Sequence, residues 1–437
     1  MKRIIVVGGG PAGMMAAVKA AEYGAEVLLL ECMDRVGRKM SITGKGRCNI
    51  TNAADLQEIL SNIPGNGAFL NSSLRAFDQQ DVIRFFEEAG VPTKVERGNR
   101  VFPQSDKAAD VVQAMLERLH LLGVKIRTKA RVTALLAEDL PRESEGIPTK
   151  PGKMRQTQAI CGVRLEDGTA ESADAVILAV GGASYPGTGS SGDGYPMAER
   201  LGHTVTKLLP ALVPLETEEE WPKEAQGLSL RNVRVALFSE GKRLQELFGE
   251  MLFTHFGVSG PLILSLSRRA AQELDAGHFV EISINLKPAL TPEQLDARIC
   301  RDFGKYIRKQ AKNGLHDLLP GKLIPIVLDL AYLDADKPIH QITQEERRRL
   351  GETIQHMTLT ISRTRPMEEA IVTSGGISVK EIQPKTMESK LVKGLYFAGE
   401  VVDVDAFTGG YNLQAAFSMG AAAGQWSAME GKGVQNG

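Results

Sequence analysis

Short apolar runs that end at glycine recur three times along the chain. Ile4–Val7, Ala175–Val180 and Leu395–Ala398 are uninterrupted apolar stretches, the pattern of strands buried on both faces of a parallel sheet. Glycine after such a strand lets the backbone turn tightly and approach a ligand closely. We therefore expect three strand ends to contact one extended ligand. The glycines that follow the three runs are Gly8, Gly9, Gly10 and Gly13; Gly181, Gly182, Gly187, Gly189, Gly192 and Gly194; and Gly399, Gly409, Gly410, Gly420 and Gly424.

The first part of the chain alternates between strand and helix patterns. After Ile4–Val7, a helix over Ala12–Tyr23 and a strand over Ala25–Glu31 complete a βαβ unit. Apolar periodicity also predicts a helix over Ala108–Leu121, and Arg97-Gly98-Asn99 indicates a hairpin across Thr93–Phe102. The remaining expectations are a helix near 82–89, strands at 124–128, at 131–136 and before Asp167, a loop over 34–53, and a solvated polar loop over 138–157.

The pattern of apolar and polar residues changes near residue 205, and the pattern of short apolar runs followed by glycine returns near residue 370. Asn232–Phe238 and Phe279–Leu286 alternate apolar and polar positions, which is typical of half-buried antiparallel strands. Residues 291–355 are helix-rich and charged. We therefore predict one α/β domain built from residues 1–204 and 366–437, interrupted by an insert over 205–365 that is first β-rich and then helical.

The composition and net charge of the chain limit the classes of partner that we expect it to bind. The 437 residues carry 52 basic and 53 acidic side chains, a net charge of −1, so we expect no nucleic-acid partner. The four cysteines have no CxxC spacing, which predicts neither a disulfide framework nor a metal site and fits a cytoplasmic protein. No apolar run approaches the roughly 18 residues that cross a bilayer, so no membrane partner is expected. The oligomeric state is left open.

The first glycine cluster predicts a dinucleotide site. Gly8, Gly10 and Gly13 form GxGxxG directly after a strand and at the start of a helix, where main-chain amides and the helix dipole receive a pyrophosphate. Pro11 and Ala12 lie in the same turn. Glu31 ends the second strand and can accept from ribose hydroxyls, which favours FAD or NAD over NADP. A tight turn without a ligand is the alternative.

Residues 35–52, RVGRKMSITGKGRCNITN, follow the ribose-binding acid directly. We interpret this loop as lying over the pyrophosphate, with Arg38 and Lys39 close to the phosphates. Cys48 is a candidate redox or covalent group, although a lone cysteine is more often a small buried packing residue. A charged surface loop is the alternative for the whole segment.

The second glycine cluster contains a further GxGxxG at Gly187–Gly192. Its context argues against a separate nicotinamide-binding unit, because the preceding strand ends several residues earlier and no second βαβ unit follows. We expect Gly181 and Gly182 to end a strand of the first domain and pass its cofactor. Asp193 is expected to cap the next helix.

The third cluster follows an apolar strand that ends at Gly399-Glu400. Glu400 suits the acid that holds the ribityl chain in flavoproteins with two dinucleotide folds. After the turn at Gly410, a helix of small residues begins near Tyr411, and the amides near Asn412 and Leu413 are expected to face the flavin pyrimidine ring. The small residues of this helix predict close packing on the sheet.

The chain resembles the bacterial YhiN/BaiN-type flavoproteins, the aminoacetone-oxidase-like FAD-binding family. The resemblance rests on GGGPAG, GRKMSITGKGRCNITN, GGASYPGTGSSGDGY, GEMLFTHFGVSGP, TSGGISVKEIQPKTMESK and GLYFAGEVVDVDAFTGGYNLQAA. It implies noncovalent FAD on a glutathione-reductase-like Rossmann fold with an insert that is part β-barrel and part helical. Val132 completes the set of candidate FAD contacts. The chain departs from the family pattern at Val180, where threonine is frequent, and at Lys45, where glycine is frequent.

We therefore predict an FAD-dependent oxidoreductase of a small organic substrate, with dioxygen or NAD(P)H as the other redox partner and NAD(P)H as a candidate transient co-substrate. Substrate is expected between the FAD domain and the insert. His255, in the insert motif THFGVSGP, is a candidate for proton transfer, with a structural role in a tight turn as the alternative. The alternative functions are flavin-dependent tRNA modification and a non-enzymatic flavin redox sensor.

Overall fold

A computed structural model describes residues 1–141 and 155–429 of the chain. The chain divides into two compact units, one formed by Met1–Leu209 with Met367–Gly437 and the other by Pro210–Pro366. The predicted α/β fold interrupted by an insert is confirmed. Most of the loop predicted over 138–157 lies outside the described residues.

A five-stranded parallel sheet forms the centre of the first unit, in the order β20-β10-β1-β2-β6. The three apolar runs that precede glycine clusters are β1, β10 and β20, and these three strands are neighbours in the sheet. Because the carboxyl ends of parallel strands meet at one edge of a sheet, the three glycine clusters start from the same edge. The strands span Arg3–Val7 (β1), Glu26–Leu30 (β2), Lys125–Arg127 (β6), Ala175–Leu178 (β10) and Leu395–Phe397 (β20).

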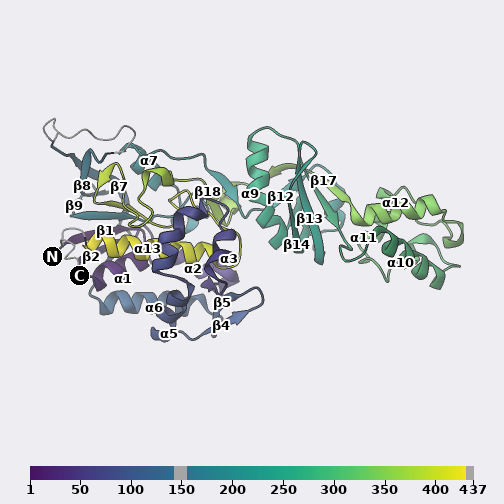
Figure 1. Ribbon diagram of the computed structural model, residues 1–437, viewed down its shortest axis with the longest axis horizontal. Helices are drawn as coiled ribbons and strands as arrows, with labels where there is room; N and C mark the ends of the chain where they lie inside the picture. The colour runs from purple at the N-terminus through teal and green to yellow at the C-terminus, as the bar shows by residue number, and fades with distance from the viewer. Residues whose placement is uncertain (142–154, 430–437) are drawn as a thin grey trace. The chain divides into compact units, whose positions relative to one another are not determined.

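Helix α13 (Tyr411–Met429) packs along helix α1 (Pro11–Glu22) (Figure 1). A Cβ added at Gly420 or Gly424 would overlap the carbonyl groups of α1, so these glycines bring the two helix backbones into close approach. The prediction that the small residues of this helix pack on the sheet is therefore wrong for the two glycines. An uninterrupted run of small residues does not reveal which neighbour will use it.

The segment over 34–53, predicted to be a loop, instead contains helix α2 (Arg38–Ile42), a 3-10 turn over Thr43–Gly46 and strand β3 (Thr51–Asn52). Gly37 has φ 72 and turns the chain into α2, whose Met40 is buried with 1% exposure. A helix of five residues is too short to give a readable apolar period, so the pattern did not reveal it.

The remaining elements of the first unit cover and flank this sheet. The predicted hairpin is confirmed as β4 and β5, which pair antiparallel, and β3 pairs with β5 as the third strand of this sheet. A second small sheet has the order β19-β8-β7, with β9 on β8. The bounds are Leu56–Ser61 (α3), Asn71–Ala76 (α4), Gln79–Glu88 (α5), Ala108–Leu121 (α6), Gly194–Glu199 (α7), Thr93–Glu96 (β4), Arg100–Pro103 (β5), Val132–Asp139 (β7), Gln158–Leu165 (β8), Ala170–Ser172 (β9), Val372–Ser374 (β18) and Val392–Lys393 (β19).

The second unit combines a closed six-stranded barrel, with strand order β12-β15-β14-β13-β16-β17, and helices, most of which lie in sequence between β16 and β17. Alternate residues of its strands are buried, as Ile282 and Ile284 on β16 show. The implied barrel-plus-helix insert is thereby confirmed. The bounds are Leu209–Ala211 (β11, at the sequence boundary), Leu215–Thr217 (β12), Ser229–Ser239 (β13), Lys242–Thr254 (β14), Gly257–Ser259 (β15), Val280–Asn285 (β16), Met357–Thr364 (β17), Trp221–Glu224 (α8), Pro261–Asp275 (α9), Pro292–Lys305 (α10), Leu323–Leu330 (α11) and Gln344–Gln355 (α12).

Candidate functional site

The turn between β1 and α1 has the geometry of a phosphate cradle. Gly8 has φ 106 and donates its N–H to the Leu30 carbonyl at 2.8 Å, and a Cβ on Gly13 would overlap the Gly8 carbonyl. Gly10 faces open space, since an added Cβ would meet no atom within 4 Å. The first intrahelical bond runs from Met14 N to Gly10 O at 2.9 Å, which leaves earlier amides of α1 available to an anion. Gly8 and Gly13 therefore shape the turn, and Gly10 borders open space directly before the start of α1.

Glu31 is tied to this turn more closely than the sequence indicated. Its side chain is 8% exposed, and its two carboxylate oxygens accept the N–H of Gly9 at 2.7 Å and the N–H of Met33 at 2.8 Å. The neighbouring Cys32 thiol also donates to Glu31 at 3.3 Å, and burial followed by this negative charge raises the pKa of Cys32 to about 11. Glu31 thus fixes the turn as well as standing at the strand end where a ribose is expected.

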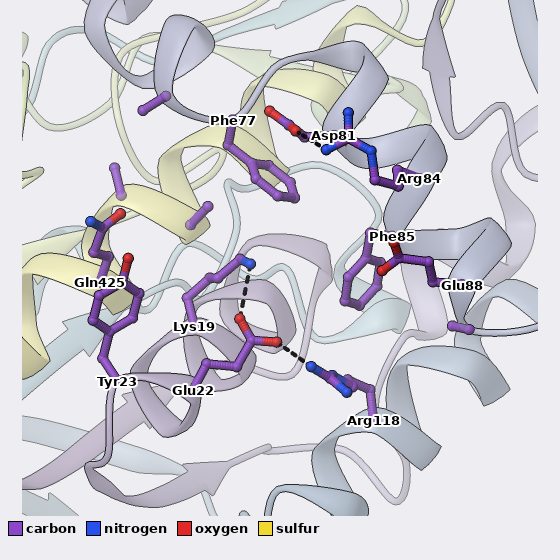
Figure 2. Close-up of a pocket in the computed structure, with 14 residues that line it drawn as sticks. Lys19, Glu22, Tyr23, Phe77, Asp81, Arg84, Phe85, Glu88, Arg118 and Gln425 are labelled. Atoms are coloured by element: carbon purple, nitrogen blue, oxygen red, sulfur yellow. Dashed lines mark hydrogen bonds and ion pairs between the residues drawn. The ribbon is translucent and has the colours of Figure 1, made fainter.

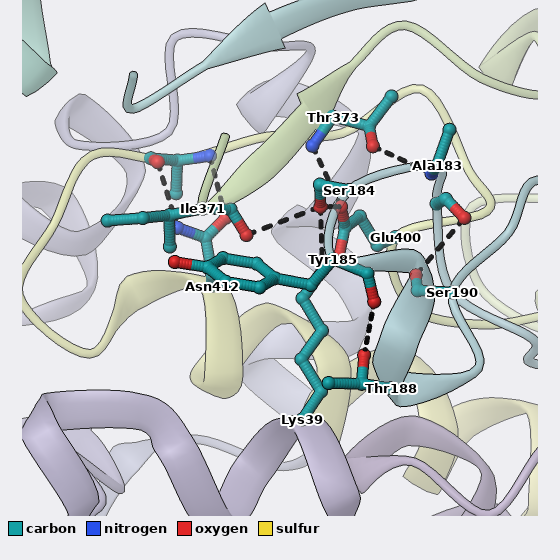
Figure 3. Close-up of polar contacts among 12 residues, drawn as sticks. Lys39, Ala183, Ser184, Tyr185, Thr188, Ser190, Ile371, Thr373, Glu400 and Asn412 are labelled. Atoms are coloured by element: carbon teal, nitrogen blue, oxygen red, sulfur yellow. Dashed lines mark hydrogen bonds and ion pairs between the residues drawn. The ribbon is translucent and has the colours of Figure 1, made fainter. Parts of the chain in front are cut away.

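Arg38 and Lys39, predicted to lie together near the phosphates, point to different partners. Arg38 forms an ion pair with Asp34 at 3.1 Å, whereas the Lys39 ammonium donates to Glu400 at 2.7 Å and to the Ser184 hydroxyl at 2.8 Å (Figure 3). The sequence reasoning treated the two as equivalent because a five-residue helix was not foreseen. On α2 consecutive side chains diverge by roughly 100°.

Glu400 is the centre of a polar network that joins three distant segments. Besides Lys39, its carboxylate accepts from the Ser184 hydroxyl at 2.9 Å and from the Thr373 N–H at 2.8 Å (Figure 3). The Thr373 hydroxyl in turn accepts from the Ala183 N–H at 2.8 Å. The sequence reasoning missed Ser184 and Thr373, because only the order of strands in the sheet brings residues so far apart in sequence together.

Gly181 and Gly182 lie beside this network. Gly181 has φ 79, and a Cβ on Gly182 would stand 2.7 Å from a Glu400 carboxylate oxygen. Gly399 has φ 80 and lies against Ala12, where an added Cβ would come within 2.8 Å of that side chain. The turns after β10 and β20 therefore meet the start of α1.

The N-terminus of α13 is held in place by side chains from its own turn. Asn412 accepts the Ala406 N–H at 3.0 Å and donates to the Ala406 carbonyl at 2.9 Å, so its amide braces the preceding loop. Gly410 has φ 99 and lies against the Thr51 main chain. At the start of α13 the Gln414 N–H donates to the Gly410 carbonyl at 3.0 Å. The main-chain amides of Asn412 and Leu413 precede this bond in the first turn of α13, where a helix has no acceptor of its own for them.

A buried hydrogen-bond network that the sequence did not reveal fixes α13 further along. The Gln414 side chain is fully buried, accepts from the Thr51 hydroxyl at 2.5 Å and donates to the Phe77 carbonyl at 3.3 Å and to Ser418 at 3.0 Å. Ser418 also donates to the Phe77 carbonyl at 2.7 Å. Fully satisfied buried networks of this kind specify one arrangement of their segments.

Two residues assigned a role from the sequence, Asp193 and Val132, lie near β7. Asp193 stands at the N-cap position of α7, but its carboxylate pairs with Arg131 and makes no capping hydrogen bond. The predicted capping role is therefore wrong, because a neighbouring guanidinium competes successfully for the carboxylate. Val132 is 5% exposed and pairs with Leu165 in the β7–β8 ladder.

The two candidate catalytic residues occupy contrasting environments. Cys48 is fully buried in the core of the first unit, and burial raises the pKa of its thiol to about 12, an environment that favours the packing role. His255 belongs to the second unit, where it is exposed at the hairpin between β14 and β15 and packs edge-on against Phe256, with ring centroids 4.9 Å apart. Their catalytic roles stay predictions.

A cavity of about 360 Å³ lies elsewhere in the first unit, at the C-terminal end of α1 (Figure 2). Among its charged groups, Glu22 bonds Lys19 at 2.9 Å and Arg118 at 2.6 Å. Because open α/β sheets bind ligands beyond the carboxyl ends of their strands, at the other end of α1, this cavity is separate from the candidate site.

No helix in residues 1–141 and 155–429 is both long enough and apolar enough to cross a membrane.

Comparisons with known proteins identify the relatives of this chain. The family described as HI0933-like protein Rossmann domain matches residues 2–426. The chain is 33% identical over 431 residues to the 3-dehydro-bile acid Δ4,6-reductase of Clostridium scindens, covering 98% of this chain and 99% of that protein. It is 29% identical over 416 residues to the ribosomal RNA dihydrouridine synthase of Escherichia coli, covering 95% of each. A solved 3-ketosteroid Δ1-dehydrogenase from Sterolibacterium denitrificans aligns over 98% of this chain and 100% of its own, with a TM-score of 0.53 and 12% identity, a likeness of fold alone.

Proposed function

The chain belongs to the HI0933-like Rossmann family, and on that premise we propose that this FAD-dependent oxidoreductase reduces a carbon–carbon double bond conjugated to a carbonyl group. NAD(P)H is the proposed source of electrons. The observation that supports the proposal most strongly is that two of its relatives are named for the same type of reaction. A 3-dehydro-bile acid Δ4,6-reductase and a dihydrouridine synthase are both named for saturating a double bond in a ring that carries a carbonyl.

The residues of the first unit fit FAD. The open space at Gly10, the amide-bearing N-terminus of α1 and the N-terminus of α13 are the features that a pyrophosphate and an electron-rich pyrimidine ring require. FAD bound there supplies hydride transfer. We infer that it is held by the candidate residues Gly8, Gly10, Pro11, Ala12, Gly13, Glu31, Arg38, Lys39, Val132, Gly181, Gly182, Gly399, Glu400, Gly410, Asn412 and Leu413.

The protein groups around this site would bind and orient rather than react. Lys39 and Ser184 hold the Glu400 carboxylate, and that carboxylate is the proposed acceptor for the hydroxyls of the ribityl chain. The α13 amides would stabilise negative charge on the reduced ring, an effect that is strong where water is excluded.

A small conjugated ketone is the proposed substrate class, since the bile-acid reductase shares 33% identity over nearly the whole chain. Uracil in RNA is the second candidate, favoured by the 29% identity to two ribosomal RNA dihydrouridine synthases. The net charge of −1 argues against RNA, because proteins that bind nucleic acid usually carry a basic surface.

The test is an anaerobic oxidation of the reduced holoprotein. Protein loaded with FAD is reduced with NADPH or NADH and then mixed with a steroid 4-en-3-one, with 2-cyclohexen-1-one, or with ribosomal RNA that lacks dihydrouridine. We expect the enones to reoxidise the flavin and to gain two hydrogens by mass spectrometry. Reoxidation by RNA alone would transfer the function to uracil reduction. Reoxidation by dioxygen, but by none of the three compounds, would refute the proposal.

A further inference from the structure

Tyr185 has a backbone conformation that its sequence context disfavours. It lies in the turn after β10, between Ser184 and Pro186, and has φ 54 and ψ 58. Residues before proline prefer extended backbone, and a left-handed conformation is strained for any residue that carries a side chain. Strain of this kind persists only where the surrounding structure imposes it, and it is concentrated at functional sites.

The surrounding structure holds Tyr185 from both sides. Its carbonyl accepts the Thr188 N–H and the Thr188 hydroxyl, both at 2.8 Å. The preceding Ser184 is fully buried and bonds Lys39 and Glu400. The turn is therefore anchored to the same network that surrounds the proposed ribityl position, and the Tyr185 side chain has a defined direction.

Figure 3 shows the Tyr185 ring extending from this turn toward Asn412 at the start of α13. The residue is half-buried. Ser184, Lys39 and Glu400 use their polar groups on one another, whereas the Tyr185 hydroxyl makes no hydrogen bond within residues 1–141 and 155–429. An O–H group without a hydrogen-bond partner among the described residues thus extends from the turn after β10 toward the start of α13.

The buried Tyr195 and Tyr411 do not offer such a group. Tyr195 is 4% exposed, and its hydroxyl is sealed in the core, where burial raises its pKa. Tyr411 is 6% exposed, and burial raises its pKa also. Tyr23 is 41% exposed and lines the cavity at the far end of α1, so it serves as a matched control.

We propose that Tyr185 is the proton donor of the reaction, an inference that rests on the proposed function. The β-carbon of the conjugated substrate receives the hydride that reduced FAD supplies, and the α-carbon receives the phenolic proton of Tyr185. The carbon–carbon π bond breaks as the two C–H bonds form, and the phenolate regains a proton from water. The two electrons come from the nicotinamide that reduced the flavin. General acids of this type contribute about 10²–10⁴-fold to a rate.

The test compares Tyr185→Phe with Tyr23→Phe. Phenylalanine keeps the ring and the turn and removes only the hydroxyl. We expect FAD affinity and flavin reduction by NADPH to stay at the wild-type level in both variants. Flavin reoxidation by 2-cyclohexen-1-one should slow at least about 100-fold in Tyr185→Phe alone. The fluorescence lifetime of bound FAD should lengthen in the same variant, because a phenol close to the ring quenches excited flavin by electron transfer and a phenyl group does not.

Each result decides one point. A wild-type protein that no enone reoxidises overturns the proposed function and this inference with it. A wild-type protein that reacts, with a Tyr185→Phe variant that reacts at the same rate, overturns the role of Tyr185 and leaves the function standing. An unchanged fluorescence lifetime shows that the phenol does not lie near the flavin and also overturns the inference.

Discussion

Replacing Glu31 by glutamine tests whether this side chain fixes the phosphate turn. In the native structure its two carboxylate oxygens face two main-chain donors, Gly9 N–H at 2.7 Å and Met33 N–H at 2.8 Å. Glutamine has nearly the same shape but presents one oxygen and one NH₂ group. Whichever way the amide is turned, one of the two N–H donors then faces another donor.

The magnitude follows from the burial of the site. Glu31 is 8% exposed, so water cannot readily replace the lost acceptor. A hydrogen bond to a charged group contributes about 1.5–3 kcal/mol, and leaving a buried donor unsatisfied costs about 1–3 kcal/mol. We expect the free energy of unfolding to fall by about 2 kcal/mol. If the Gly9 donor loses its partner, FAD binding should weaken roughly 10- to 100-fold, because the turn must be reformed on binding.

The assay measures urea unfolding of the FAD-free protein and the FAD dissociation constant by fluorescence. Glu22→Gln is the matched control, since Glu22 is also on the first unit and bonds Lys19 and Arg118, but at a side-chain exposure of 22%. Partly exposed ion pairs contribute about 1 kcal/mol or less. Equal unfolding midpoints and equal FAD affinities in Glu31→Gln and wild type would refute the assignment of Glu31 to the turn.

Three further predictions follow from the same packing and charges. Gly420→Ala should destabilise the protein by about 1–3 kcal/mol in thermal unfolding, because the added methyl group overlaps α1. Gly187→Ala should not, because Gly187 has open space around it. Equal melting temperatures for Gly420→Ala and the wild type would contradict the close packing of α13 on α1. Lys39→Met should weaken FAD binding about ten-fold in equilibrium dialysis by leaving Glu400 without its cation, with Lys39→Arg retaining most of the affinity; full affinity in Lys39→Met would argue against the network. Burial raises the pKa of Cys48 to about 12, so at pH 8 about one Cys48 thiol in 10⁴ is ionised to the reactive thiolate. Iodoacetamide should therefore label the exposed Cys300 before Cys48 in peptide mass spectra. Rapid labelling of Cys48 would contradict its burial.

The fold could be predicted from the sequence where an apolar run is followed directly by glycine or where apolar and polar positions alternate. The runs before the three glycine clusters are strands β1, β10 and β20, and alternation identified β13 and β16 in the barrel. These elements are long or strongly patterned, so local sequence and final structure favour the same conformation. Helix α9 (Pro261–Asp275) was not predicted, although its apolar positions repeat at helical spacing.

The candidate site was readable only in part. Motif spacing located Glu31 and Glu400 at strand ends, since a strand and its following turn are adjacent in sequence. It could not reveal that Glu31 holds Gly9, or that Glu400 binds Ser184 and Thr373. Those partners depend on the order of strands in the sheet and on the directions in which the side chains of α2 point. A single sequence reveals neither.

The order of the strands has a consequence for synthesis on the ribosome. Strand β10 lies between β1 and β20, but residues 210–394 must be made before β20 leaves the exit tunnel. At about 5–20 residues per second this takes roughly 10 to 40 s. During that time β10 is an edge strand with free main-chain groups, and α1 lacks the helix that packs on it. The nascent first unit is therefore an incomplete sheet while the barrel strands have already been made, and the candidate site at the strand ends is completed only when α13 has been made.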